Sequence, residues 1–225
     1  MYDRVGFHAG PVAFGAVVET APVMGVLREN RLDVRAGASV QGSGKLDFGN
    51  EIRADQPILT SARLVLRPLL HSDAALLALY TGDKRVAEGT RSIPHPLPAG
   101  ATEAFIKHAQ STAREEDVWA LDGSVAGYDS VMGLLSLKPL DRKQSQIGFW
   151  VAPAFWNAGF ASEAVRTVIK NNPHQSRTLF AEVFQDNPAS AQVLMNAGFD
   201  YLGEAEAKSV ARGALVPTWT YIRRM

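Results

Sequence analysis

Cysteine is absent from this chain of 225 residues, which excludes a disulfide framework, Cys-based zinc sites and a thiol nucleophile. An excess of one charge is also lacking, because 23 Lys and Arg residues balance 23 Asp and Glu residues. Net charge therefore gives no general attraction to nucleic acid or to an anionic membrane. The longest apolar stretch, residues 10–27, is interrupted by Pro11, Glu19 and Pro22 and is too short to span a bilayer. These absences favour a cytoplasmic protein that binds neither nucleic acid nor membrane.

The chain divides near Gln56-Pro57. Residues 1–56 are rich in Gly, Ala and Val and show no sustained helical or alternating pattern. We expect them to form a poorly ordered N-terminal extension, and Met24 is another candidate start of the natural protein. A small strand-forming appendage is the alternative. Residues 57–225 are periodic throughout and are expected to form one domain.

A Gly- and Ser-rich stretch at residues 37–45 reads as a flexible linker. It ends in a Gly-Lys pair, as a phosphate-binding loop does. That motif, however, requires glycine where Ser39 stands and Ser or Thr where Leu46 follows Lys45. The stretch is therefore not a phosphate-binding loop.

Hydrophobic periodicity and Pro or Gly punctuation predict the elements of the second part of the chain. The expected order mixes hairpins with one crossover, which indicates a mixed sheet flanked by helices. The expected strands are 64–67, 118–121, 131–137, 146–151, 178–184, 201–208 and 218–223, and the expected helices are 74–80, 101–113, 161–170 and 189–196.

A turn of small residues opens one of these helices. Gly159 breaks regular structure, and a helix-compatible run follows it directly. Backbone N–H groups at the start of a helix point toward one spot and favour a phosphate or diphosphate. A plain connection between a strand and a helix is the simpler interpretation. The candidate residues are Trp156, Asn157, Ala158, Gly159, Phe160 and Ala161.

A second motif lies at the end of the strand 178–184. Asn187 and Pro188 precede a helix that has Ser190 in its first turn, and the helix closes with Asn-Ala-Gly-Phe at residues 196–199. Asn and Ser at these positions suit helix capping, which they do in many proteins. They also suit hydrogen bonding to a ligand that enters at the end of the strand.

Together the two motifs resemble the acyl-CoA site of the GNAT acetyltransferases, in particular the branch that acetylates the N-termini of ribosomal proteins. The resemblance covers residues 57–225 and implies an α+β fold, with a mixed, mostly antiparallel sheet of six to seven strands and about four helices. It implies acetyl-CoA as co-substrate, no metal, and diphosphate binding at residues 156–161. The family turn has the form Q/R-x-x-G-x-G/A, and this branch usually begins it with Trp. The chain departs from the pattern at Asn157, where Gly is common, and at Ala158, where Lys, Arg or Gln is common.

The strand before the turn ends in Phe149, Trp150 and Val151. It resembles the family strand that splays from its neighbour and binds the pantetheine arm, and the resemblance implies that an amide near Val151 polarises the thioester carbonyl. Negative charge develops on that oxygen as an amine attacks, so a backbone donor stabilises the transition state. The same residues also suit a core strand with aromatic packing, and both interpretations can hold at once.

Within the resemblance, Asn187 and Ser190 contact pantetheine or the departing sulfur. Many members place a Tyr seven residues after the Asn, and here that position is Leu194. Ser190 then becomes the candidate catalytic residue that supplies a proton to the thiolate, as in the ribosomal-protein branch.

The general base is the least defined part of the expected site. An ammonium must lose its proton before it attacks a thioester, so a carboxylate or a water held by one is expected. Branch members often carry Glu where Gln146 stands. Glu182, on the strand that leads to the second motif, is the candidate base, and Glu163 is as well explained by the helix dipole. His95, in a Pro-rich loop that borders the acceptor site in the family, is the candidate substrate-binding residue.

The leading hypothesis is transfer of an acetyl group from acetyl-CoA to a primary amine, on a protein N-terminus or a small molecule, by direct attack and without a covalent enzyme intermediate. An aminoglycoside-type acceptor shares this chemistry. One alternative is an inactive acyl-CoA-binding sensor or scaffold, which Gln146 favours. The other is an interaction module without CoA affinity, acting through residues 1–56. We expect a monomer or a homodimer.

Overall fold

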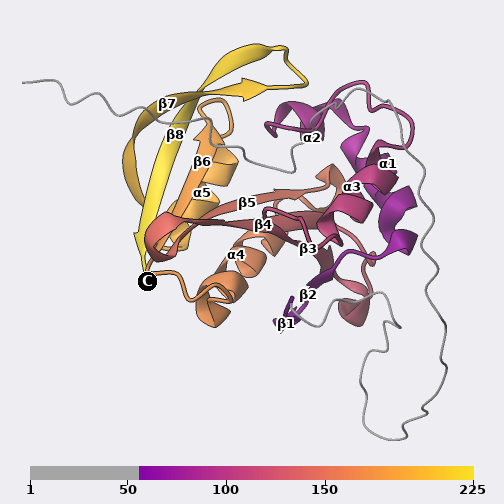
Figure 1. Ribbon diagram of the computed structural model, residues 1–225, viewed down its shortest axis with the longest axis horizontal. Coiled ribbons are helices and arrows are strands. Elements are labelled where there is room, and N and C mark those ends of the chain that lie inside the picture. The colour runs from indigo at the N-terminus through magenta and orange to yellow at the C-terminus, as the bar shows by residue number, and fades with distance from the viewer. Residues whose placement is uncertain (1–55) are drawn as a thin grey trace, which may run out of the picture.

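The computed structural model describes residues 56–225, so the extension expected at residues 1–56 lies outside the described residues except for Gln56. One sheet of eight strands organises this part of the chain, in the order β1-β2-β3-β4-β5-β6-β8-β7 (Figure 1). All neighbouring strands are antiparallel except β5 and β6, which are parallel. The strands are β1 (Leu59–Thr60), β2 (Val65–Pro68), β3 (Asp117–Asp122), β4 (Gly133–Leu140), β5 (Gln144–Val151), β6 (Thr178–Phe184), β7 (Asp200–Ser209) and β8 (Ala214–Arg224).

Five α-helices accompany the sheet in the described chain. Among them, α4 is the longest, and it begins after Gly159 in the left-handed region (φ 82°) and ends at Asn172, also left-handed (φ 40°). In α5 the side chain of Asn187 accepts a hydrogen bond from the Ser190 N–H, and Pro188 occupies the first turn, where its missing N–H costs nothing. The helices are α1 (Ala74–Thr81), α2 (Lys84–Glu88), α3 (Ala101–Ala109), α4 (Phe160–Asn171) and α5 (Pro188–Asn196).

The predicted α+β class is confirmed, with more elements than expected. The strand expected at residues 178–184 has the same bounds in the structure, and the other expected elements are present with shifted ends. Two elements were not predicted, β1 and α2. They contain only two and five residues, too few to show a period in the sequence.

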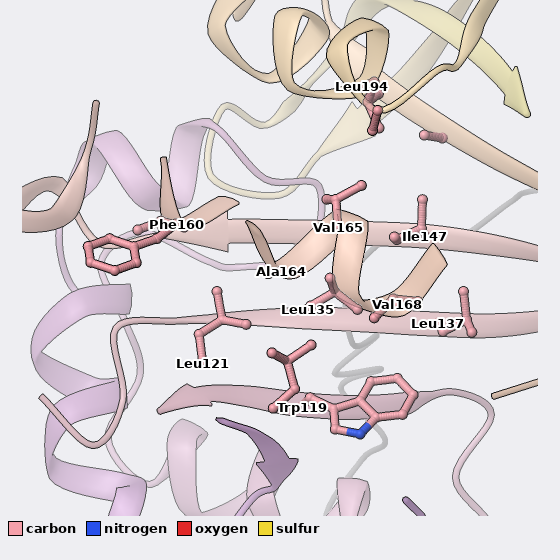
Figure 2. Packing of buried hydrophobic residues seen from close by; sticks show 14 of the residues in the cluster. Trp119, Leu121, Leu135, Leu137, Ile147, Phe160, Ala164, Val165, Val168 and Leu194 are labelled. Carbon is pink, nitrogen blue, oxygen red and sulfur yellow. The ribbon is translucent and has the colours of Figure 1, made fainter. Parts of the chain in front are cut away.

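Both faces of the central strands are buried because side chains alternate between two cores. One core contains Trp119, Leu135 and Ile147 and packs against α4 and α5. Figure 2 shows the α4 side chains Ala164, Val165 and Val168 beside these strands. The neighbouring strand residues point to the opposite face and pack with α1 and α3. That second core contains Leu69, Leu77, Ile106, Val118, Ala120, Val131 and Leu134.

A buried ion cluster joins the second core to the sheet. The Arg67 side chain is 2 % exposed, and its Nε donates to Asp122 Oδ2 at 2.8 Å. Its Nη1 and Nη2 donate to the two carboxylate oxygens of Asp73 at 2.8 and 2.9 Å. Paired and bidentate geometry makes such a buried charge tolerable. The cluster fixes the start of α1 to β2 and β3.

The parallel strands β5 and β6 separate partway along their length. They pair at Gln144–Thr178, Ser145–Leu179 and Gln146–Phe180, and no further pairs form between them although both strands continue. The outer edge of β6 stays paired with β8 along its whole length. A wedge-shaped gap therefore opens in the middle of the sheet, toward the C-terminal ends of β5 and β6.

Candidate functional site

A cavity of about 140 Å³ lies at this gap. Residues of β4, β5 and β6 form its floor, and α1, α3 and the loop after α2 cover it. Most of the lining is apolar, with a few polar side chains that point inward, a combination typical of small-ligand sites. The apolar lining includes Leu77, Ile93, Leu97, Phe105, Val118, Leu134, Phe149, Trp150 and Phe184.

The exposed edge of β5 presents backbone groups to the gap. The Ala152 N–H donates to Met132 O at 2.8 Å, on the β4 side. Because successive N–H groups of a strand point to opposite edges, the amides of Val151 and Phe149 point away from β4 and into the gap. The edge of β5 that faces the gap thus offers backbone donors to a ligand.

The turn between β5 and α4 is fixed to the end of β5. Trp156 Nε1 donates to Val151 O at 2.6 Å. Asn157 (φ 60°) and Gly159 (φ 82°) are both left-handed, a conformation in which glycine carries no strain. Among the described residues, no side chain caps the N-terminus of α4. Its first N–H groups are therefore available to an anion from outside the chain.

Arg63, in the connection between β1 and β2, places a cation beside this turn. Its Nη1 donates to Ala158 O at 3.0 Å, and its guanidinium lies 4.3 Å from the ring centre of Phe160. Its Nε donates to Glu163 Oε2 at 2.7 Å, while Ser61 Oγ donates to Glu163 Oε1 at 2.8 Å. These hydrogen bonds outweigh burial and lower the pKa of the Glu163 carboxyl. Glu163 therefore ties α4 to a remote turn, in addition to any effect on the helix dipole.

Aromatic rings pack against one another beside the turn. Phe155 and Phe160 flank it in the sequence, and their ring centres lie 6.4 Å apart in an edge-to-face arrangement. Tyr128 contacts Phe160 with ring centres 5.0 Å apart, and Tyr80 contacts Phe155 at 6.1 Å. Such packing restricts the backbone of the turn, so the amides are preorganised for a ligand.

Asn187 and Ser190 both line the cavity where β6 leads into α5. Asn187 Oδ1 accepts from the Ser190 N–H at 3.1 Å, so the capping interaction expected as the simpler interpretation is present. Capping uses only the oxygen of Asn187. It leaves the Asn187 amide nitrogen and the Ser190 hydroxyl able to bond a ligand in the gap.

Two glutamates border the cavity from opposite sides. Glu182 of β6 lies with Arg91, whose Nη1 donates to Oε2 at 2.8 Å. Glu116, one residue before β3, accepts a hydrogen bond from the Ser136 hydroxyl of β4. Burial raises the pKa of both carboxyls despite these partners. A raised pKa suits a group that must take up a proton near neutral pH.

Two further residues considered in the sequence analysis, His95 and Gln146, lie outside the cavity lining. His95 is exposed and does not line the cavity, although its neighbours Pro94 and Leu97 do. Gln146 is 4 % exposed, lies at the last β5–β6 pair and does not line the cavity. Thr218 of β8 does line it, is 1 % exposed, and its hydroxyl has no hydrogen-bond partner within the described chain. An unpaired buried hydroxyl is costly, which fits a group that bonds a ligand.

Sequence reasoning missed Glu116, Arg63 and Arg91. Glu116 stands in the acidic run Glu115-Glu116-Asp117, which reads as a solvated surface segment. Alternation from the buried Val118 places Glu116 on the cavity face, and this signal was present in the sequence. Arg63 and Arg91 had no local signal, because their partners lie 100 and 91 residues away.

Comparison with known proteins decides the family. Residues 63–200, more than half of the chain, match the acetyltransferase (GNAT) domain. The chain belongs to the GNAT acetyltransferase family. The uncharacterized N-acetyltransferase YoaA of Bacillus subtilis (strain 168) is 28 % identical over 156 residues, which cover 65 % of this chain and 85 % of YoaA.

Solved GNAT structures share the fold at lower identity. The microcin C7 self-immunity acetyltransferase MccE, solved with acetyl-CoA and AMP, has a TM-score of 0.64 at 14 % identity, covering 73 % of this chain and 94 % of MccE. The ribosomal L7/L12 alpha-N-protein acetyltransferase RimL, solved with coenzyme A, has a TM-score of 0.63 at 17 % identity, covering 75 % of this chain and 98 % of RimL. These likenesses confirm the GNAT fold expected from the two motifs.

The residues present in this GNAT chain suit an acyl-CoA. The uncapped start of α4 and the Arg63 guanidinium suit a diphosphate, and the open edge of β5 suits an amide-bearing arm. Among residues 56–225, no group of three or more His, Cys, Asp or Glu side chains is arranged to hold a metal ion. In the same range, no helix is long and apolar enough to cross a membrane.

Proposed function

We propose that this protein transfers an acetyl group from acetyl-CoA to a primary amine by direct attack. One observation supports this most strongly. The gap between β5 and β6 holds a cavity bordered by two carboxylates with raised pKa values, and the start of α4, free of a side-chain cap within residues 56–225, follows the end of β5 in the chain. A donor held along the gap would present its thioester to an amine in the cavity.

The chain offers a separate group for each part of the donor. The amides of residues 159–161 and the cation of Arg63 would hold the diphosphate. The amides of Phe149 and Val151, with the side chain of Asn187, would hold the pantetheine arm. This arrangement leaves the acyl end beside Trp150 and the cavity.

The same elements supply the chemistry. The Val151 amide would stabilise the oxyanion, a contribution typically worth about 10²- to 10³-fold in rate. The Ser190 hydroxyl would supply a proton to the departing thiolate, while Glu182 and Glu116 are the carboxylates available to the ammonium. Because Arg91 pairs with Glu182, that carboxylate is suited to orienting the ammonium.

The cavity restricts the acceptor. Its volume of about 140 Å³ and its mostly apolar lining suit an amine on a short apolar group. Either a small-molecule amine or the first residue of a protein meets that description. A bulky polycationic acceptor does not, because Arg91 offsets one of the two carboxylates.

The test measures release of CoA thiol from acetyl-CoA in the presence of a panel of primary amines. The protein contains no cysteine, so a thiol reagent reports CoA without background from the enzyme. We expect Ser190→Ala to lower kcat about 10²-fold, and Ser72→Ala, at an exposed serine that precedes α1 and does not line the cavity, to leave kcat unchanged. Binding of acetyl-CoA without turnover of any amine would support the sensor or scaffold, and absence of binding would support the interaction module.

A further inference from the structure

Glu116 lies between the cavity and a second pocket. It lines both the cavity at the gap and an open, polar pocket of about 230 Å³ beside the start of β3 and the end of β4. The second pocket is otherwise lined by Thr112, Arg114, Glu115, Asp117, Pro139 and His174. A titratable group that borders both spaces can exchange a proton with each of them.

The hydrogen bond of Glu116 to β4 places its carboxylate near β5, the strand along which the donor would be held. The Ser136 hydroxyl donates to it, and Ser136 lies directly opposite Gly148 of β5 in the sheet register. Gly148 has no side chain and lines the cavity floor just where β5 leaves β6. An ammonium above Gly148 therefore lies between Glu116 and Glu182.

The two glutamates differ in their surroundings. Glu182 lies 2.8 Å from the guanidinium of Arg91, which favours its ionised form and opposes the burial that raises its pKa. Lys138 also attracts the Glu116 carboxylate, but its Nζ donates to Glu115 at 2.7 Å. In the open pocket, Asp117 is engaged by Arg114 Nε at 2.8 Å and by His174 Nε2 at 2.9 Å.

We propose that Glu116 takes the proton of the acceptor ammonium and passes it to solvent through the open pocket beside Asp117 and His174. This inference rests on the proposed acetyl transfer. The ammonium gives one proton to Glu116, and its nitrogen then forms the C–N bond as the C–S bond breaks. The second proton lost by nitrogen ends on the CoA thiolate. Each turnover therefore releases one proton, by way of Glu116.

The experiment compares the pH dependence of kcat/KM for the wild type, Glu116→Gln and Glu182→Gln. Glu103→Gln, at an exposed position on α3, is the matched control. We expect the wild type to lose activity as pH falls, because a protonated Glu116 accepts no proton. Glu116→Gln should lower kcat about 10²-fold or more and abolish this acidic limb. Glu182→Gln should still lose activity as pH falls, and its KM for the amine should rise. The thermal shift caused by acetyl-CoA should be the same in all four proteins.

A second variant tests the exit through the open pocket. Glu116→Ala should be partly reactivated by added formate, which reaches the vacated position from that pocket, whereas Glu182→Ala should not. An unchanged pH profile in Glu116→Gln, or failure of formate to reactivate Glu116→Ala, would overturn the proton route alone. A wild type that binds acetyl-CoA and acetylates no amine would overturn the proposed function and the route with it.

Discussion

A single residue without a side chain controls access to the α4 amides. Gly159 has φ 82°, and a Cβ placed on it would lie 3.6 Å from Arg63 Nη2. We predict that Gly159→Glu lowers the affinity for acetyl-CoA at least 10²-fold, because a carboxylate would occupy the position that the phosphate requires. Titration calorimetry with acetyl-CoA measures the effect directly.

The matched control for this prediction is Gly159→Ala. It adds the backbone strain of a left-handed residue, about 1 kcal/mol, without adding charge. Its affinity should therefore fall much less than that of Gly159→Glu. Equal affinity of Gly159→Glu and the wild type would show that the turn does not bind the phosphates.

Another single residue, Glu163, makes the free energy of unfolding depend on pH. Its carboxylate accepts from Ser61 Oγ, from the Arg63 N–H and from Arg63 Nε, and these hydrogen bonds lower its pKa. The folded-state pKa is below the unfolded one, so the stabilisation is complete above the usual Glu pKa and is lost as pH falls through the folded value. We predict that Glu163→Gln lowers the free energy of unfolding by about 1 kcal/mol at pH 7. Urea unfolding between pH 7 and pH 3 should show the two proteins converging, and Glu204→Gln, at an exposed site, should show no difference at any pH.

Residues with a local signal could be predicted from the sequence, and residues defined by distant partners could not. Asn187 and Ser190 are three positions apart on one helix start, so their joint placement follows from local geometry. Arg63 reaches the α4 turn only through the fold, and nothing near it in the sequence indicates that role. The sequence predicted the strand that carries Glu182 but not the face of the sheet on which its side chain lies. In the structure, Glu182 pairs with Arg91 and lines the cavity.

At the scale of elements, the ion cluster of Arg67 holds α1, β2 and β3 together. Its three side chains are almost fully buried, with exposures of 2 % for Arg67, 3 % for Asp73 and 6 % for Asp122. We predict that Asp73→Ala lowers the free energy of unfolding by about 3–5 kcal/mol, because it leaves a buried guanidinium with an incomplete set of partners. Urea unfolding measures this loss, and Asp200→Ala at an exposed site should change stability by less than about 0.5 kcal/mol. A small effect at Asp73 would mean that water replaces the lost carboxylate.

The elements themselves were easier to predict than the gap between them. Thr178–Phe184 alternates and ends at polar residues, so its bounds follow from the pattern. The separation of β5 from β6 after Gln146 and Phe180 could not be predicted from the pattern of either strand, because hydrophobic periodicity indicates a strand and not the neighbour with which it pairs. Only the resemblance to the GNAT family indicated that these strands splay.

On the scale of the whole molecule, both hydrophobic cores described above are formed within residues 56–225. Every member of the two buried clusters lies between Leu59 and Tyr221. The contacts at the start of this region are specific, since Gln56 Nε2 donates to Val118 O at 2.9 Å and Trp119 Nε1 donates to Pro57 O at 2.8 Å. The boundary of the folding unit can therefore be tested to within two residues.

We predict that a protein lacking residues 1–55 melts cooperatively at nearly the same temperature as the full chain. Removing residues 1–57 deletes both hydrogen bonds, which contribute about 1 kcal/mol each. In a domain of this size that loss should lower Tm by about 4–8 °C. Calorimetry on the two truncated proteins makes the comparison. If the shorter deletion already abolished the cooperative transition, residues 1–55 would belong to the folding unit, and the two cores would not be sufficient to stabilise the sheet.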